Sequence, residues 1–313
     1  MNTNRSCGCK SFRSCYICEK EFGIKNSDTA QDRVDGFQTI FKFCLEQELL
    51  FSDTDNAPQS DGIPFPGVKI FPEFISIEEE KQLIQDLDSL PWDASQSGRR
   101  KQNFGPKANF KKRKAKVGDF RGFPICTKFI QDRFASLPCL KDYKTVEQCS
   151  IEYRPETGSR IDPHIDDCWI WGERIVQLNL LSDSYLTCLP YLGDKTKYNL
   201  PDLSTFPKIL DDEANVVFNP FDDANLRHDN APSYSLKDTQ KLLNGAVKIP
   251  LPRRSLLVFF GEPRYDWEHC ILRQDISQRR IVIAYREFTP PYLPGGAHED
   301  IGEEILNKAK EFW

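Results

Sequence analysis

Apolar residues in this chain recur in short blocks, and the spacing within each block predicts the element it forms. Between residues 76 and 90, apolar side chains recur at three- and four-residue intervals, which is the helical period. Ser76 followed by Glu79 forms a capping-box sequence that starts such a helix, and Pro91 ends it. The pattern therefore predicts a capped amphipathic helix that ends before Pro91.

Later apolar blocks are short and rich in β-branched and aromatic residues, and Pro or Gly separates them. Such blocks are typical of strands. The blocks in the main part of the chain are Gly67–Phe71, Ile175–Leu181, Leu256–Phe260 and Ile281–Tyr285. Short strands after an opening helix indicate an α+β domain whose core is a β-sandwich or jelly roll. Residues 37–44 and 49–51 suit a strand pair or a short helix.

Composition divides the chain into four segments. Residues 1–20 are rich in cysteine, and residues 21–62 read as an extension or linker that includes a polar loop at 53–62. Residues 63–296 form the main domain, and residues 297–313 form a tail in which a short helix is expected from Glu303 to Trp313. Within the main domain, residues 183–240 are acidic and lack periodicity, which indicates a functional lid or a disordered insertion.

The overall composition is that of a globular protein. Of 313 residues, 39% are hydrophobic and 28% charged, and the chain is long enough to bury a sizeable core. No run of 18 apolar residues occurs, and the first thirty residues contain no apolar signal core. We therefore expect a protein of the cytoplasm and nucleus without a membrane partner, in which the eleven cysteines are thiols or metal ligands. The oligomeric state stays open.

The net charge of −5 conceals two opposed patches. Residues 99–116 hold nine Lys or Arg and no acid, whereas residues 183–240 hold ten acids against five bases. Phe104 and Phe110 lie among the cations, and such a mixture is what a nucleic-acid surface uses. The same cations would also dock an acidic protein surface, and a solvated basic loop is the third interpretation. Composition does not separate the three.

Two of the four histidines stand in informative settings. His164-Ile-Asp166 sets an imidazole and a carboxylate two residues apart, which on a strand places both on one face. His269 precedes an apolar pair. Two histidines and one carboxylate on one face of a metal ion leave three positions open, as in non-haem Fe(II) oxygenases. Taken singly, an H-x-D tripeptide is more often a surface turn, and a lone histidine is more often structural.

Two arginines follow His269 at a spacing that adds weight to this hypothesis. Arg280 and Arg286 flank an apolar strand and lie six residues apart, so a regular strand points both to the same side. Inward arginines need anions to offset their burial. A dicarboxylate fits, because one end can chelate a metal ion while the other meets a guanidinium. The alternative is two solvated arginines at the ends of a strand.

Taken in order, these residues resemble the AlkB family of 2-oxoglutarate oxygenases. The motifs H-x-D, R-x-x-W-x-H-x-I and R-x-x-x-x-x-R stand here at residues 164–166, 264–271 and 280–286. The match is closer to the homologue-four subfamily, whose traits occur at residues 7–18, 97–107, 161–167 and 169–174. The resemblance runs from the first cysteines to about Gly296, apart from the acidic stretch.

The resemblance implies a double-stranded β-helix with flanking N-terminal helices. It also implies an Fe(II) site and a cosubstrate site that uses 2-oxoglutarate and dioxygen. The implied iron ligands are His164, Asp166 and His269. The implied 2-oxoglutarate residues are Arg280 for the distal carboxylate, Arg286 for the end nearer the iron, and Tyr153.

Two departures from the family's pattern matter. The Asn that the family carries two residues before the cosubstrate tyrosine is Ile151 here, which puts one cosubstrate hydrogen bond in doubt. The segment between the second and third iron ligands is longer than usual, and residues 183–240 account for it. We expect that insertion to lie outside the barrel.

The resemblance also implies an oxidative N-demethylase whose lid faces the substrate. The lid residues are Arg99, Arg100, Lys101, Phe104, Lys107 and Phe110. The subfamily is associated with a monomethylated lysine of actin and with N6-methyladenine in DNA. We rank a protein lysine first and a nucleic-acid base second, and a non-catalytic adaptor is the third hypothesis.

Four cysteines lie within twelve residues near the start of the chain: Cys7, Cys9, Cys15 and Cys18. Four thiolates at this spacing can reach one tetrahedral ion, for which zinc is the usual choice. An iron–sulfur cluster uses the same ligands, and a redox pair at 15–18 or four free thiols are the other interpretations.

Overall fold

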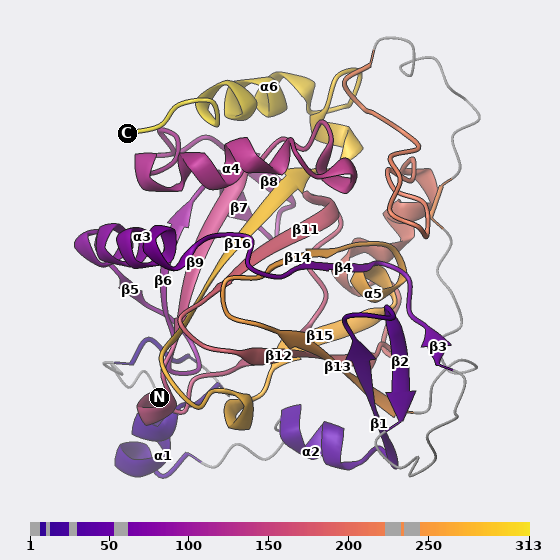
Figure 1. The fold of residues 1–313 in the computed structure, drawn as a ribbon. Helices are drawn as coiled ribbons and strands as arrows, with labels where there is room; N and C mark the ends of the chain where they lie inside the picture. The colour runs from indigo at the N-terminus through magenta and orange to yellow at the C-terminus, as the bar shows by residue number, and fades with distance from the viewer. Residues whose placement is uncertain (1–6, 11–12, 25–29, 53–61, 223–232, 235–244) are drawn as a thin grey trace.

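The computed structural model describes the chain except residues 1–6, 11–12, 25–29, 53–61, 223–232 and 235–244. The described residues form a mixed α+β fold with two seven-stranded sheets and one two-stranded hairpin (Figure 1). The loop expected at 53–62 and two parts of the acidic stretch thus lie outside the described residues, except for Gly62.

The first sheet has the strand order β10-β15-β12-β13-β1-β2-β3. Its strands are β1 (Thr39–Cys44), β2 (Leu49–Ser52), β3 (Ile63–Pro64), β10 (Ile161–His164), β12 (Ser184–Pro190), β13 (Gly245–Leu251) and β15 (Trp267–Ile271). Strands β10, β15, β12 and β13 pair antiparallel, whereas β1 joins β13 in parallel.

The second sheet has the order β4-β14-β11-β16-β9-β6-β5, and all its pairs are antiparallel. Its strands are β4 (Val68–Phe71), β5 (Asp93–Ala94), β6 (Arg100–Phe104), β9 (Glu147–Tyr153), β11 (Trp171–Leu180), β14 (Leu256–Phe259) and β16 (Arg280–Phe288). The hairpin that follows β6 consists of β7 (Lys107–Asn109) and β8 (Lys114–Lys116).

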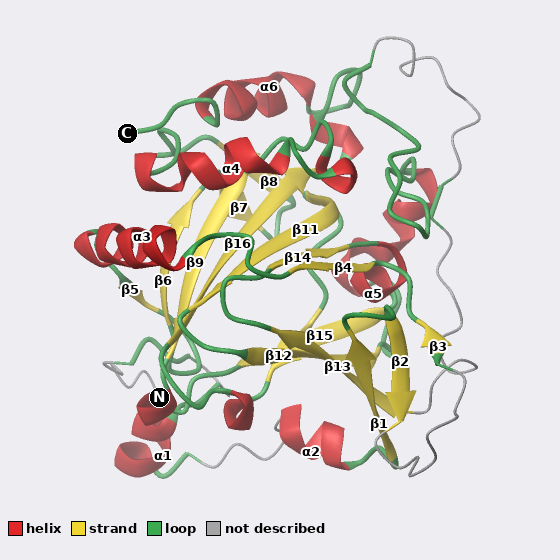
Figure 2. Ribbon diagram, viewed as in Figure 1, coloured by secondary structure: helices red, strands yellow, loops and turns green. Residues whose placement is uncertain are grey.

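The helices lie on the outside of the sheets (Figure 2), except for the short α5, whose residues are all buried. They are α1 (Tyr16–Phe22), α2 (Ala30–Asp35), α3 (Ile77–Ser89), α4 (Lys128–Phe134), α5 (Gly261–Tyr265) and α6 (Glu299–Lys308). Helices α3 and α4 cover the second sheet, and α1 and α2 lie near the first. No helix in the described part of the chain is long and apolar enough to cross a membrane.

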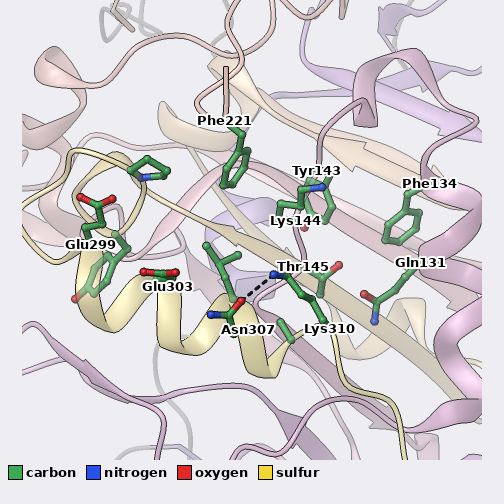
Figure 3. Close-up of a pocket in the computed structure, with 14 residues that line it drawn as sticks. Gln131, Phe134, Tyr143, Lys144, Thr145, Phe221, Glu299, Glu303, Asn307 and Lys310 are labelled. Carbon is green, nitrogen blue, oxygen red and sulfur yellow. Dashed lines mark hydrogen bonds between the residues drawn. The ribbon is translucent and has the colours of Figure 1, made fainter. Parts of the chain in front are cut away.

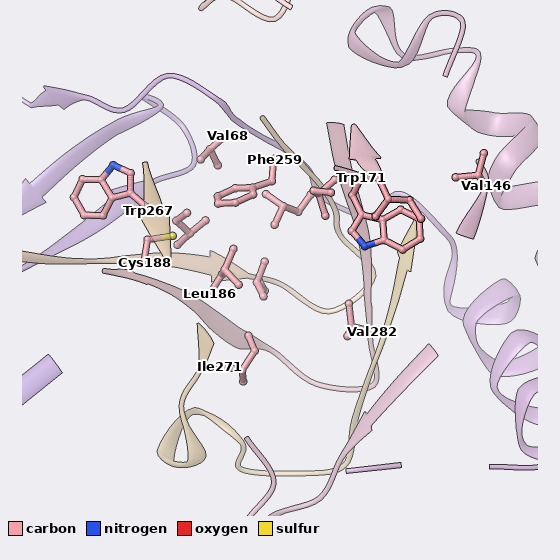
Figure 4. Close-up of a cluster of buried hydrophobic side chains, with 14 of the residues drawn as sticks. Val68, Val146, Trp171, Leu186, Cys188, Phe259, Trp267, Ile271 and Val282 are labelled. Carbon is pink, nitrogen blue, oxygen red and sulfur yellow. The ribbon is translucent and has the colours of Figure 1, made fainter. Parts of the chain in front are cut away.

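The main hydrophobic core contains side chains from both sheets (Figure 4). Leu186 and Ile271 come from the first sheet, Phe259 and Val282 come from the second, and all four are buried. Burial of each such side chain contributes about 1.5–3 kcal/mol. Because β11, β14 and β16 are buried on both faces, their sequences read as nearly continuous apolar runs, which explains why the sequence located them.

The predicted opening helix is confirmed in detail. The Ser76 hydroxyl accepts a hydrogen bond from the Glu79 amide at 3.1 Å, and the Glu79 carboxylate accepts one from the Ser76 amide at 2.8 Å. Helix α3 ends at Ser89, two residues before Pro91. The four predicted strands are also present, as β4, β11, β14 and β16.

Three expectations need correction. The strand pair expected near residues 37–51 is present as β1 and β2, but it is part of the first sheet rather than of a linker, because β1 pairs with β13. The acidic stretch does not lie wholly outside the sheets, since β12 occupies residues 184–190 between β15 and β13; any insertion begins after Pro190. The tail is docked on the body, where Ile305 is fully buried and Phe312 packs on Phe123, and α6 begins at Glu299.

Glu173 of β11 ties the segment after β12 to the second sheet. Its carboxylate accepts a hydrogen bond from the Ile209 amide at 2.6 Å. Burial raises the pKa of Glu173 to about 7. Above the ordinary pKa of a glutamate the unfolded chain releases this proton, whereas the folded protein keeps it until about pH 7. The contribution of Glu173 to the free energy of unfolding is therefore present at low pH and is lost as the pH rises through about 7.

We expect Glu173→Gln to flatten the fall of stability that occurs as the pH rises from 5 to 8. Relative to the wild type, the variant should gain up to about 3 kcal/mol at pH 8, because it removes a buried charge while keeping an acceptor for Ile209. Urea unfolding at both pH values measures this. Glu304→Gln, at an exposed position of α6, should leave the pH dependence as it is.

A cavity of about 520 Å³ lies between α6 and the segment before β9 (Figure 3). Glu299, Glu303 and Asn307 line it from α6, and Tyr143 and Lys144 line it from the other side. It shares no lining residue with a second cavity, described below, that His164 lines.

Candidate metal centre and cosubstrate pocket

The two histidines and the aspartate singled out from the sequence lie together. His164 ends β10 and is the direct cross-strand partner of His269 in β15, with ring centroids 4.4 Å apart. Asp166 follows two residues later, beyond the end of the strand rather than on it. One side-chain atom from each of the three residues lies within 4.8 Å of the others, so the three could hold one metal ion.

The donor atoms fit a divalent cation. Nδ1 of His164 donates a hydrogen bond to the carbonyl of Asp162 at 2.9 Å, which leaves Nε2 with a free lone pair. Nε2 of His269 lies 3.8 Å from Oδ2 of Asp166, and Oδ2 is buried without a hydrogen-bond partner among the described residues. A buried carboxylate oxygen without a hydrogen-bond partner, next to two imidazoles, is a donor set that a divalent cation would satisfy.

The protonation states suit metal binding as well. Burial lowers the pKa of His164, and burial together with the neighbouring His164 lowers the pKa of His269 well below its ordinary value. Burial alone would raise the pKa of Asp166, but Arg286 and His269 bring it well below its ordinary value. The site therefore offers two neutral imidazoles and one carboxylate, the states in which these side chains bind metals.

Arg286 of β16 is held against the metal-facing aspartate. Its Nη2 lies 2.9 Å from Oδ1 of Asp166, and its Nη1 lies 2.5 Å from Oε2 of Glu147. Burial disfavours the charge, but Asp166 and Glu147 raise the pKa of Arg286 above its ordinary value. Arg286 thus orients the carboxylate of Asp166 and leaves Oδ2 turned toward the histidines.

Arg280, six residues earlier on the same strand, is fully buried, and no carboxylate in the described part of the chain pairs with it. Its Nε donates to Oδ1 of Asn179 at 2.6 Å, while Nη1 and Nη2 have no partner among the described residues. Burial lowers the pKa of Arg280 to about 10. The guanidinium also lies 5.1 Å from the ring of Tyr153, its cross-strand neighbour. Two orphaned N–H groups in a buried fork fit a carboxylate that binds side-on.

Asn179 and Glu147 carry parts of the site that the sequence did not single out. The amide of Asn179 donates to three backbone carbonyls, which fixes its Oδ1 toward Arg280. A polar residue in the middle of the apolar run 175–181 was the available signal, because a fully buried amide needs partners. Ile151 lies on β9 two residues before Tyr153, so the family's asparagine has no counterpart at that position.

A cavity of about 360 Å³ opens onto His164 and Asp166, and His269 lies behind them without lining it. Its other lining residues are Arg13, Arg99, Phe110, Glu147, Ile161, Asp162, Ile165, Asp167, Trp171, Tyr198 and Arg286. Acidic, basic and aromatic side chains thus share the entrance.

The predicted lid residues fall into three places. Arg99 and Phe110 line the cavity that contains His164. A neighbouring groove of about 630 Å³ shares Phe110 with that cavity and is lined in part by Lys101, Phe104 and Lys107. Arg100 lies elsewhere, paired with the buried Glu152 and stacked over Trp92. The alternation of β6 explains why Arg100 and Lys101 separate, because successive side chains of a strand point to opposite faces.

The four N-terminal cysteines form a second cluster. One sulfur from each lies within 4.8 Å of the others, and all four residues are buried. None of the described cysteines forms a disulfide. Four buried thiols at these distances match the ligand set of a tetrahedral metal site.

Comparisons with known proteins agree with this geometry. The chain is 38% identical over 98% of its length to human "alpha-ketoglutarate-dependent dioxygenase alkB homolog 4", of which it covers 94%. It is 36% identical over 98% of its length to the mouse protein of the same name, of which it covers 95%. A nematode protein, "DNA N6-methyl adenine demethylase" of Caenorhabditis elegans, is 27% identical over 97% of this chain and 94% of its own. No protein-family model matches the chain.

Among solved structures, that of OsALKBH1 aligns with a TM-score of 0.41 and 10% identity over 71% of this chain and 97% of that chain. The relatives define the class of protein as an alpha-ketoglutarate-dependent dioxygenase. The chain belongs to the AlkB family. Membership implies the use of Fe(II), 2-oxoglutarate and dioxygen in oxidative demethylation.

Proposed function

We propose that this enzyme removes the methyl group from a monomethylated lysine of a protein such as actin. The reaction consumes 2-oxoglutarate and dioxygen, hydroxylates the N-methyl carbon, and yields succinate, carbon dioxide, formaldehyde and the free amine. Fe(II), bound by His164, Asp166 and His269, supplies the oxidising chemistry. The observation that carries the choice of an amine is a carboxylate in the wall of the cavity, that of Asp167.

Asp167 is suited to meet a cationic substrate. Its carboxylate accepts a hydrogen bond from the neutral amide of Asn199 at 2.9 Å, and no Lys or Arg nitrogen of the described residues lies within ion-pair distance of it. Burial and the neighbouring Asp166 raise the pKa of Asp167. A methylammonium group would pair with this carboxylate, and the aromatic faces of Tyr198 and Phe110 in the same cavity favour a cation.

The protein's other residues position the reactants. The two N–H groups of Arg280 bind the distal carboxylate of 2-oxoglutarate, and Tyr153 lies beside that guanidinium. Arg286 keeps Asp166 ionised and oriented and meets the end of 2-oxoglutarate nearer the metal. Asn179 holds Arg280 by its Nε, so the fork is in place before the cosubstrate arrives.

The scaffold of this site is a double-stranded β-helix formed by β9 to β16. Support comes from the strand order: β10-β15-β12-β13 in one sheet and β14-β11-β16-β9 in the other, with all these pairs antiparallel. Along the chain, consecutive strands belong alternately to the two sheets, except that β12 and β13 both belong to the first sheet. This winding brings β10, β15 and β16 to one site from widely separated parts of the chain.

Asp167→Asn is expected to raise the KM for a monomethyl-lysine peptide about tenfold, because one charge-assisted contact is lost. The KM for 2-oxoglutarate should stay within about twofold, since Asp167 is assigned no contact with the cosubstrate. Formaldehyde release from the peptide measures both. Glu213→Gln, an exposed change in the acidic stretch, is the matched control. An unchanged KM for the peptide in Asp167→Asn would remove the argument for an amine.

The second candidate substrate is N6-methyladenine in DNA. It is favoured by the activity named for the nematode relative and by the cations of the β7–β8 hairpin beside the larger groove. Methylated oligonucleotides and the peptide, assayed side by side, separate the candidates. Binding of DNA through phosphates would also weaken steeply with salt, whereas a slope near zero excludes such contacts.

The cysteine cluster supports one further assignment, a structural zinc ion. Zinc favours four thiolates in a tetrahedral arrangement, and a structural site is closed, as this buried cluster is. An iron–sulfur cluster would be coloured, so the absorption spectrum of the purified protein distinguishes the two.

A further inference from the structure

The cysteine cluster is packed against the two loops that frame the catalytic cavity. The backbone of Gly98 hydrogen-bonds to the sulfur of Cys9. A Cβ added to Gly98 would lie 3.1 Å from Cβ of Cys15 and 2.7 Å from the carbonyl of Thr157. The turn at Gly98 is therefore wedged between the cluster and the loop that leads into β10. Arg99, the next residue along the chain, lines the cavity.

The turn at residues 97–98 depends on this packing. Ser97 has a φ of 54° and Gly98 a φ of 73°, and a left-handed conformation is costly for serine. The hydroxyls of Thr157 and Ser159 both donate to the carbonyl of Gly98 at 2.8 Å, and the amide of Arg160 donates to the carbonyl of Ser97. Contacts from both sides hold the turn.

The cysteine module, as we call the described part of residues 1–20, also contacts the loop before β10 through α1. Arg273 pairs with Glu19 of α1 at 2.8 Å and donates from its Nε to the carbonyl of Gly158 at 3.0 Å. The ring of Tyr16 lies 4.3 Å from the same guanidinium. The module is thus attached at two separate points to the segment that ends in His164.

Arg13 extends from the cysteine module into the mouth of the catalytic cavity. It lies on the chain between Cys9 and Cys15 and lines the same cavity as His164. Its Nη1 donates to Oε1 of Gln96 at 2.6 Å, and its Nε lies 3.3 Å from the carboxylate of Asp162. The side chain keeps 40% of its surface exposed at the mouth of the cavity.

We infer that a metal ion in the cysteine cluster supports the mouth of the cavity that His164 and Asp166 line. The ion holds the turn at residues 96–99 in place. It also positions Arg13 to contact an acidic side chain that flanks the methylated lysine. The choice of a lysine peptide rests on the proposed function, whereas the holding of the turn does not. Zinc held by Cys9 and Cys15 would fix the chain on both sides of Arg13.

The first arm of the test measures metal and backbone protection. We expect one zinc per chain in the wild type and none in Cys9→Ser/Cys15→Ser, with Cys126→Ser, outside the cluster, as the control. Hydrogen exchange at residues 95–99 and 154–160 should be at least about tenfold faster without zinc, and exchange in α6 should be unchanged. Wild-type protein without zinc, or unchanged exchange at both loops after zinc loss, overturns the inference.

The second arm uses Arg13→Ala, which leaves all four cysteines in place. It should retain zinc and raise the KM for an acidic monomethyl-lysine peptide about tenfold. The KM for 2-oxoglutarate should stay within about twofold, because Arg160 still pairs with Asp162 at 3.1 Å. Lys10→Ala, an exposed change on the same loop, should alter neither constant.

The results separate the two proposals. A wild type that does not demethylate the peptide refutes the lysine substrate, while the exchange experiment still decides whether zinc holds the turn. A peptide that is demethylated with the same KM by wild type and Arg13→Ala refutes the role of Arg13.

Discussion

Asp166→Ala is expected to lose its bound iron and to lower 2-oxoglutarate turnover by more than about a hundredfold. Loss of a residue that merely supports a metal ligand costs about 10- to 100-fold, so loss of a ligand should cost more. The substitution also leaves Arg286 with Glu147 as its remaining carboxylate partner among the described residues. Iron content after anaerobic loading and succinate formation measure the two effects.

The control for this experiment is Asp300→Ala on α6, which removes an exposed carboxylate without touching the site. Circular dichroism establishes that both variants are folded. If Asp166→Ala bound one equivalent of iron as tightly as the wild type, the assignment of Asp166 as a metal ligand would be wrong.

Arg280→Ala is expected to raise the KM for 2-oxoglutarate by about 30-fold to several thousandfold. Truncating one partner of a buried, hydrogen-bonded charge pair costs about 2–5 kcal/mol, and each 1.4 kcal/mol is a factor of ten. Arg280 is fully buried, and its two terminal nitrogens have no other partner among the described residues. Iron binding should be retained, because Arg280 contacts Asn179 and Tyr153 rather than the histidines.

Arg279 supplies the matched control for Arg280. It precedes Arg280 directly, but its guanidinium pairs with Asp88 and Glu152 on the other side of the sheet. Arg279→Ala should therefore leave the KM for 2-oxoglutarate within about twofold of the wild type. Equal effects of the two substitutions would show that Arg280 acts through stability rather than through the cosubstrate.

The sequence predicted those parts of the fold and site that local pattern determines. The buried strands read as apolar runs, and the capping box at Ser76 marked the start of α3. Four of the residues on which the resemblance rests meet in the structure as their order implied: His164 with His269, and Arg286 with Asp166. Their roles in binding stay predictions until the experiments above are done.

What the sequence could not predict depends on contacts between distant segments. Arg13 and Asp162 are 149 residues apart in the chain and meet only because the cysteine module docks on the loop before β10. The strand β12 was absorbed into the acidic stretch, because averaging charge over many residues hides a seven-residue strand. Glu147 looked ordinary in sequence, and only its pairing with Arg286 across β9 and β16 connects it with the site.

The most direct test of the central claim is succinate formation from 2-oxoglutarate, measured on the wild type and on His164→Ala under the same iron and dioxygen supply. We predict succinate and formaldehyde in equal amounts from the wild type with a methylated substrate, and background levels of both from His164→Ala. Equal inactivity of the two proteins with every methylated substrate, or equal activity of the two, would contradict an iron site at His164, Asp166 and His269.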